Sequence, residues 1–153
     1  MGHRRLKQGN NGGFDMNGRT PAQLYALLVG GTLVIAGIIG FFYSAKFGSP
    51  GKVRDVFGIL SVNGWHNVVH LVTGALGLLA LGYAARAYAG ALGVVYIAVA
   101  VWGFILGNHE NILGFLPVNT EDNVLHALLG VAGLGAYFAT PAAAAPAQPA
   151  PAT

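Results

Sequence analysis

The sequence predicts an all-α fold, a four-transmembrane-helix bundle made of two tandem two-helix repeats. Three observations lead to this prediction. Of the 153 residues, 54% are hydrophobic and only 8% are charged, a composition typical of membrane proteins. The uncharged stretches are long enough for helices that cross a hydrocarbon layer of about 30 Å. The segment from Gly58 to Leu78 recurs 56 residues later, from Gly114 to Leu134, with 10 of 21 positions identical.

The first helix is expected over about 21–43. Thr20 and Gln23 form a capping-box pattern around Pro21, which is favoured at the first helical position. Residues 1–19 are polar, basic and rich in glycine, so we expect a disordered N-terminal arm there. Residues 20–140 then form the membrane domain, and the proline- and alanine-rich residues 141–153 form a disordered tail.

Three further helices are expected over about 64–84, 87–107 and 121–139. The third contains a GxxxG element, Gly103 and Gly107, which suits close helix packing in lipid. Thr120 is expected to cap the fourth helix, because a threonine hydroxyl can accept a hydrogen bond from the first turn. The segments between the first and second helices, and between the third and fourth, are expected to be connecting loops.

The charges of the loops predict the orientation of these helices. One side would carry most of the basic residues: Arg4, Arg5, Lys7, Arg19 and Arg86. The opposite side would carry Lys46, Lys52 and Arg54. Because basic residues are enriched in cytoplasmic loops, we expect both termini to be cytoplasmic. The basic residues form no stripe or patch, so nucleic acid is not an expected partner.

The two repeated segments share the motif Asn-x-x-His-x-x-x-Gly. Each repeat contains two helices, so both motifs enter the membrane in the same sense and lie at its outer end. Spacings of three and four place the motif residues along one face of a helix, where they would face the inside of the bundle. These residues are Asn67, His70 and Gly74 in the first copy, and Asn123, His126 and Gly130 in the second.

Two interpretations use this motif directly. In the structural one, the histidines and asparagines hydrogen-bond between repeats or to loop backbones, while Gly74 and Gly130 let the second and fourth helices approach closely. In the other, His70 and His126 are axial ligands of a haem or another tetrapyrrole, and the four Asn and Gly residues of the motifs line the cofactor site. Closely packed glycine faces would leave no room for a macrocycle, which counts against the second interpretation.

A third interpretation is a divalent metal site at the outer face. His66 and His70 lie four positions apart, a spacing that can bind one ion from a helix. His109 and Asp122 would complete this site. His66 has no histidine counterpart in the second copy, where Asp122 stands.

The sequence gives no sign of an enzyme. It has no P-loop, no dinucleotide-binding glycine pattern and no cysteine, and no serine lies beside a base. We therefore expect a non-enzymatic structural or accessory subunit of a larger membrane assembly. Its partners would be the lipid bilayer and other membrane protein subunits or further copies of itself, since short, glycine-rich helices leave smooth faces for packing.

The sequence also resembles a known family. The paired Asn-x-x-His-x-x-x-Gly motifs, the Leu-Pro-Val-Asn before Thr120 and the four-span layout are similar to small bacterial membrane proteins catalogued only as a domain of unknown function. The resemblance covers roughly residues 20–139. It implies an integral protein of a bacterial cytoplasmic or internal membrane, and it carries no activity.

Overall fold

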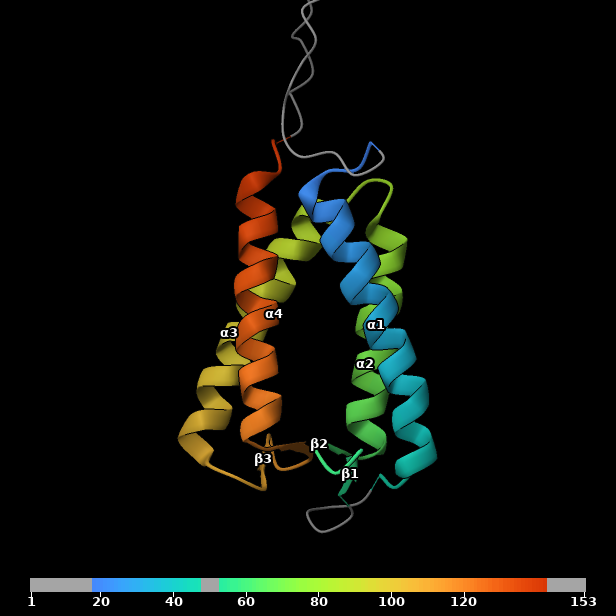
Figure 1. The fold of residues 1–153 in the computed structure, drawn as a ribbon, viewed down its shortest axis with the longest axis vertical. Coiled ribbons are helices and arrows are strands. Elements are labelled where there is room, and N and C mark those ends of the chain that lie inside the picture. Colours follow the sequence, from blue (N-terminus) through green and yellow to red (C-terminus); the bar gives the residue numbers. More distant parts are fainter. Residues whose placement is uncertain (1–17, 48–52, 143–153) are drawn as a thin grey trace, which may run out of the picture.

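The computed structural model describes residues 18–47 and 53–142, in which the order helix, hairpin, helix occurs twice (Figure 1). The first set is α1 Pro21–Tyr43, β1 Arg54–Val56, β2 Leu60–Val62 and α2 Gly64–Ala80. The second set is α3 Ala85–Leu106, β3 Glu110–Ile112, β4 Leu116–Val118 and α4 Thr120–Ala139. The predicted N-terminal arm and C-terminal tail lie outside the described residues, except for their innermost positions.

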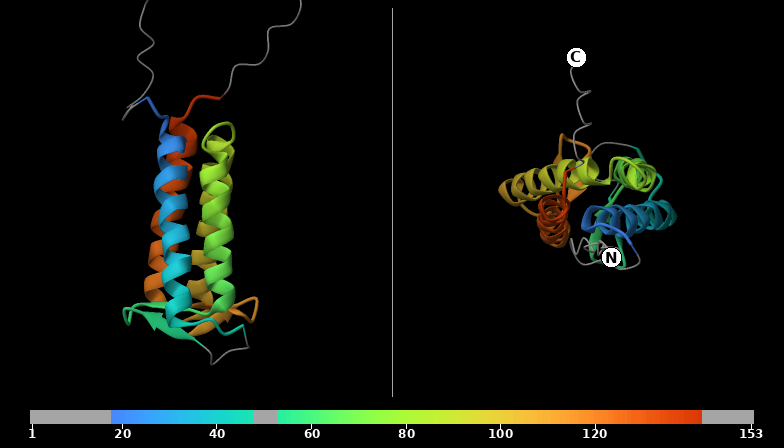
Figure 2. Two further views of the ribbon diagram at one scale, coloured as in Figure 1. Left: turned by 90° about the vertical axis from the view of Figure 1, so that its right-hand side faces the viewer. Right: turned by 90° about the horizontal axis from the view of Figure 1, so that it is seen from above.

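The four helices form two closely packed pairs, α1 with α2 and α3 with α4. The start of α1, the end of α4 and the turn between α2 and α3 lie at one end of the molecule (Figures 1 and 2). Both hairpins lie at the other end. The buried core between the pairs is made by apolar residues of α1 and α3, among them Tyr25, Leu33 and Tyr96.

The helix ends follow local capping. The capping box predicted at Thr20 is present, because the Thr20 hydroxyl accepts from the Gln23 amide and the Gln23 side chain accepts from the Thr20 amide. The prediction that Thr120 caps the fourth helix is wrong. Asn119 caps α4 and accepts from the Asp122 amide at 2.8 Å, because its backbone is extended and asparagine is a strong N-cap. Thr120 is the first residue of the helix.

The segments expected to be loops contain two antiparallel β-hairpins. Each hairpin has strands of three residues, too short for the alternation of apolar and polar residues to be recognised in the sequence. Their turns use a glycine with positive φ, Gly58 at 72° and Gly114 at 77°. The residues before these glycines, Phe57 and Leu113, also have positive φ, which apolar side chains rarely adopt.

The motif glycines pack within each helix pair, which corrects the expectation that they bring α2 and α4 together. A Cβ atom on Gly74 would lie 2.6 Å from the carbonyl oxygen of Gly30 in α1. A Cβ atom on Gly130 would lie 2.8 Å from the Ile97 side chain in α3. The expected GxxxG element is also reassigned: Gly107 has a φ of 98° and ends α3, with nothing near its Cβ position.

Two of the four helices, α1 and α3, are long and apolar enough to cross a membrane. Their outer faces carry large exposed apolar side chains, including Leu28, Ile35 and Phe42 on α1 and Val94, Val101 and Ile105 on α3. In water these side chains would add unfavourable apolar surface, whereas a hydrocarbon layer accepts them. Length and composition thus make both helices candidate membrane spans.

Candidate functional site

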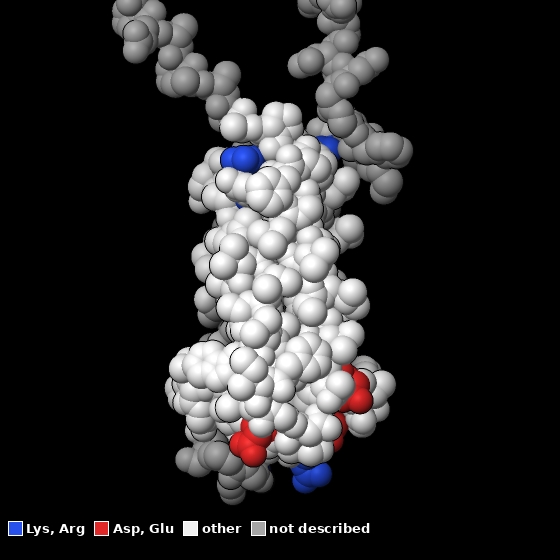
Figure 3. Space-filling model, turned by 90° about the vertical axis from the view of Figure 1, so that its left-hand side faces the viewer, with Lys and Arg blue, Asp and Glu red and all other residues white. Residues whose placement is uncertain are grey.

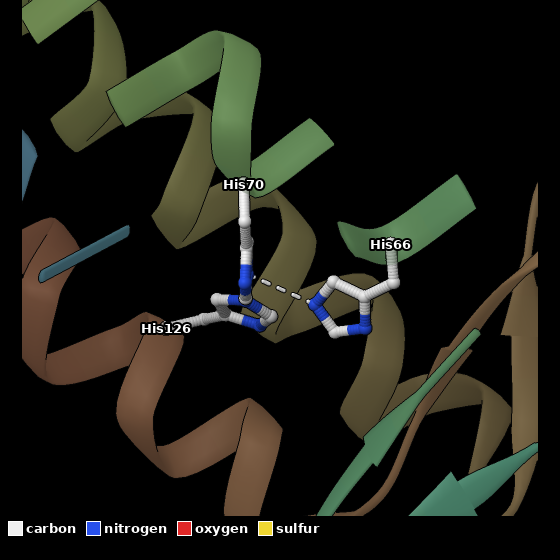
Figure 4. Close-up of side chains that lie close together, drawn as sticks. All are labelled: His66, His70 and His126. Carbon is white, nitrogen blue, oxygen red and sulfur yellow. Dashed lines mark hydrogen bonds between the residues drawn. The ribbon is translucent and has the colours of Figure 1, made fainter. Parts of the chain in front are cut away.

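Three histidines meet between the helix pairs at the hairpin end of the molecule (Figure 4). His66 and His70 come from α2, and His126 comes from α4. One ligand-capable ring nitrogen of each histidine lies within 4.8 Å of the others. His66 and His126 are buried and His70 is half-buried. We call these three residues the histidine cluster.

The His66 ring is held in one orientation by the first hairpin. Its Nδ1 lies 2.9 Å from the carbonyl oxygen of Ser61. A carbonyl only accepts hydrogen bonds, so Nδ1 carries the proton and the lone pair of a neutral ring is on Nε2. This Nε2 is 3.0 Å from Nε2 of His70. Two imidazole nitrogens bound to one metal ion would be separated by about 2.9 to 3.4 Å, so the pair is spaced for shared coordination as well as for a hydrogen bond.

His126 is held mainly by packing. Its ring lies against Tyr96 of α3, with ring centroids 5.0 Å apart. Its Nδ1 is buried and has no hydrogen-bond partner within the described part of the chain. A buried polar atom without a partner is costly, so such an atom in a native structure calls for an explanation such as a bound ion or water.

Asp122 lies beside the histidine cluster and corresponds to His66 in the repeat. Its carboxylate accepts a hydrogen bond from the Ser61 amide at 2.9 Å. His66 and Asp122 therefore both hydrogen-bond to the backbone of Ser61: His66 to its carbonyl oxygen and Asp122 to its amide. The Asp122 carboxylate is not among the ligand atoms grouped within 4.8 Å. Asp122 is thus a neighbour of the cluster, and its hydrogen bond to Ser61 fixes the first hairpin to α4.

The motif asparagines point away from the histidines. Asn67 donates to the carbonyl oxygen of Ser44 at 2.8 Å, and its Oδ1 lies where a Cβ atom on Gly40 would be. Asn123 has the same relation to Gly103. Each amide thus occupies a notch made by a glycine of the neighbouring helix. With Gly74 and Gly130 also turned to these neighbours, the motif residues gathered at the cluster are the two histidines.

His109 is outside the cluster. It is exposed in the turn that precedes β3 and has a φ of 61°. Of the residues that the sequence grouped as a metal site, the structure brings His66 and His70 together, with Asp122 alongside. His126, which the sequence assigned to a tetrapyrrole site, is the third member of the cluster.

Sequence reasoning missed Ser61 and Tyr96. Gly103 was expected at a close helix contact, and the structure places it against Asn123. One signal for Ser61 was available, because the two copies differ there: Pro117 takes its place and has no amide hydrogen to donate. The glycines of α1 and α3 also correspond, but with an offset of 63 residues, as in Gly40 and Gly103. The segment between α1 and β1 is longer than the segment between α3 and β3, so a comparison at an offset of 56 does not align these glycines. Nothing in the sequence marks Tyr96.

Two reciprocal hydrogen bonds position the helices that carry the histidines. Asn63 caps α2, and its Nδ2 donates to the carbonyl oxygen of Phe115 in the second hairpin at 2.6 Å. Asn119 caps α4, and its Nδ2 donates to the carbonyl oxygen of Ile59 in the first hairpin at 2.6 Å. Each capping residue thereby ties its helix to the other half of the chain. We call these two bonds the asparagine clasp.

These features define a mostly helical protein that has two helices able to cross a membrane and a buried cluster of three histidines. Residues 23–139 match a family described as a domain of unknown function, DUF4383, and the chain belongs to this family. No curated protein and no solved structure matches the chain. The description of the family names no activity, so a function has to be argued from the site.

Proposed function

We propose that this protein spans the membrane four times and binds one transition-metal ion through His66, His70 and His126. The observation that carries the proposal is the histidine cluster itself, whose ring nitrogens converge in a buried position. A lone buried histidine usually packs in a core, whereas three that converge from two helices have the arrangement of a metal-binding site.

The packing of the helices supports four spans. α2 lies along α1 and α4 lies along α3, so a layer crossed by α1 and α3 would surround all four. The outer faces of α2 and α4 also carry exposed apolar side chains, such as Leu76 and Leu79 on α2 and Leu128 and Val131 on α4. The face in Figure 3 shows Lys, Arg, Asp and Glu at the two ends and none along the middle. An uncharged belt of this kind suits the hydrocarbon region.

The chemistry of the ligands selects the class of metal. Three neutral imidazoles and no thiolate favour zinc or copper over magnesium or calcium, which prefer oxygen ligands. The hydrogen bond from His66 Nδ1 to the Ser61 carbonyl is the kind of outer contact that orients metal-binding histidines. Three protein ligands leave a fourth position for water or another molecule.

The same geometry disfavours the tetrapyrrole interpretation. A macrocycle between His70 and His126 would extend several ångströms around the metal in its plane. Nε2 of His66 lies 3.0 Å from Nε2 of His70 and occupies part of that space. A single ion needs no such clearance, so we favour the ion.

A metal titration tests the proposal. Protein purified in detergent and stripped with a chelator should bind one equivalent of Zn²⁺ or Cu²⁺. His66→Ala, His70→Ala and His126→Ala should each weaken binding by about 100-fold or more, because each removes a ligand. Isothermal titration and metal analysis of the dialysed protein measure both quantities.

His109→Ala is the matched control, since His109 is exposed and lies outside the cluster. It should bind the ion with unchanged stoichiometry and affinity. Equal affinities of the wild type and the three cluster variants would overturn the metal site. So would loss of binding in His109→Ala alone.

The role as a structural or accessory subunit stays a prediction of the sequence. Its support is the exposed apolar surface of all four helices, which could pack against other membrane proteins as well as against lipid. Sizing of the native protein after extraction in a mild detergent is the test. A complex larger than one chain is expected, and monomers alone would count against this role.

A further inference from the structure

Two cavities meet at the histidine cluster, one on each side of it. The first, of about 310 Å³, is lined by α1, the β1–β2 hairpin and α4. The second, of about 170 Å³, is lined by α3, the β3–β4 hairpin and α2. Many of their lining positions correspond in the two halves of the chain: Ala36 in the first cavity is matched by Val99 in the second.

The two halves differ in size at one lining position beside the cluster. Leu33 of α1 lines the larger cavity, and the corresponding position of α3 is Tyr96, which lines both cavities. The Tyr96 ring is larger and lies against His126, so it takes up space next to the cluster. The larger cavity, on the α1 side, is therefore the one with room for a ligand.

The larger cavity has apolar walls and one polar end. Its walls include Ile35, Ala36 and Ile39 of α1 and Leu125 and Leu129 of α4. The polar end is formed by the histidine cluster and Asp122. An apolar cavity with a few convergent polar groups is the usual form of a small-molecule site. The molecule that fits is amphipathic, with a long apolar body and a polar head.

The mouth of this cavity lies on the apolar outer surface. Among its lining residues, Ile35 is 59% exposed and Phe57 is 73% exposed. α1 and α4 are joined near the opposite end, where Tyr25 donates to the carbonyl oxygen of Leu129 and the Ala22 amide donates to the Thr140 hydroxyl. The ribbons of these helices diverge towards the hairpins in Figure 1. In a membrane, a ligand would enter from the lipid between α1 and α4.

The charges around the cavity select a neutral head. In the metal-free cavity, the lining residues, all within the described part of the chain, include no Lys or Arg that could pair with a carboxylate or phosphate. They already include the carboxyl group of Asp122. Without a bound metal, a buried anionic head would have no counter-charge, whereas a carbonyl or hydroxyl oxygen can hydrogen-bond to a histidine or occupy the fourth position of a bound metal.

We propose that the cavity between α1 and α4 binds a prenylated quinone or quinol, with its oxygen-bearing ring at the histidine cluster and its isoprenoid chain leading to the lipid. The position of the mouth rests on the proposed membrane placement. The apolar walls would hold the chain whether or not a metal ion is present.

The test uses the full-length protein in lipid nanodiscs and a benzoquinone with a two-isoprene side chain as the probe. Binding of one equivalent is expected by titration calorimetry, with and without Zn²⁺. Ala36→Phe should weaken binding by about tenfold or more, because its ring fills the cavity. Val99→Phe is the matched control at the corresponding position of the other cavity, and it should bind the probe as the wild type does.

A second variant fills the same cavity with a different side chain. Leu33→Tyr installs in the larger cavity the side chain that stands at the corresponding place in the smaller one, and it should also weaken binding of the probe. Retained Zn²⁺ binding shows that each variant is folded. In the absence of Zn²⁺, palmitate should not compete with the quinone. Unchanged quinone affinity in both Ala36→Phe and Leu33→Tyr would overturn the proposal, as would stronger binding of palmitate than of the quinone. A wild-type protein that binds the quinone but no Zn²⁺ would instead overturn the proposed metal site.

Discussion

At the scale of single residues, the most demanding contacts are those of the motif asparagines with glycines. The Asn67 side chain fills the place of a side chain at Gly40 and hydrogen-bonds to the Ser44 carbonyl. Asn123 and Gly103 repeat this contact in the second pair of helices. The motif asparagines therefore join the helices within each pair, and they are not part of the histidine cluster.

This contact predicts that Gly40→Ala destabilises the protein. Its Cβ atom would overlap the Asn67 amide, so the amide would have to move and weaken its buried hydrogen bond. We expect a loss of about 1 to 3 kcal/mol, seen as a lower Tm in detergent.

Gly31→Ala is the control for this variant, since its Cβ atom would meet nothing within 4 Å. Both substitutions lie inside α1 and gain the same helix propensity, so the difference between them reports the contact with Asn67. Equal Tm values for the two variants would show that the notch at Gly40 does not matter for stability.

At the scale of elements, the hairpins and helix caps act together. The asparagine clasp makes each cap serve both its own helix and the hairpin of the other half. Removal of a clasp residue should therefore cost more than removal of an ordinary cap.

Asn63→Ala is expected to lower the free energy of unfolding by about 2 to 4 kcal/mol, because it removes the cap of α2 and the hydrogen bond to the Phe115 carbonyl. Thr20→Ala, which removes only the cap of α1, should cost about 1 kcal/mol. Thermal unfolding of both variants gives the comparison. If Thr20→Ala costs as much as Asn63→Ala, the bond between the halves contributes nothing.

The helices were more predictable from the sequence than the hairpins. A capping box, long uncharged stretches and glycine spacing all act locally, and they indicated helices near the places where α1 to α4 are found. The hairpins have short strands, and their turns place Phe57 and Leu113 at positive φ instead of the usual asparagine or aspartate. Their stability comes from packing and from the asparagine clasp, which the sequence does not display.

The site was predictable only in part for a related reason. The two motif copies indicated that His70 and His126 lie at the same end of the molecule. The direction of each side chain around its helix depends on the neighbouring helix, which the motif does not contain. Hence the asparagines and glycines turned to α1 and α3, while His66, outside the motif, joined the cluster through its bond to Ser61.

At the scale of the whole molecule, the proposed four spans place the two ends of the helices on opposite sides of the membrane. The chain has no cysteine, so single cysteines can be introduced without background. Tyr83→Cys, in the turn between α2 and α3, should react with a membrane-impermeant maleimide only after cells are permeabilised.

Leu113→Cys, in the turn of the second hairpin, should react in intact cells. Both positions are exposed in the structure, so a difference in labelling reports the side of the membrane. Labelling of both cysteines from the same side would contradict the four-span arrangement.

The division of the histidine cluster between α2 and α4 has a consequence for biosynthesis. A ribosome that has made only the first helix pair has produced two of the three histidines, and the clasp partner of Asn63 is still missing. A truncated chain would therefore hold an ion weakly and leave α2 poorly anchored. On the proposed metal site and four spans, the protein should acquire the ion only after the last helix has been inserted, so metal loading would mark chains whose synthesis is complete.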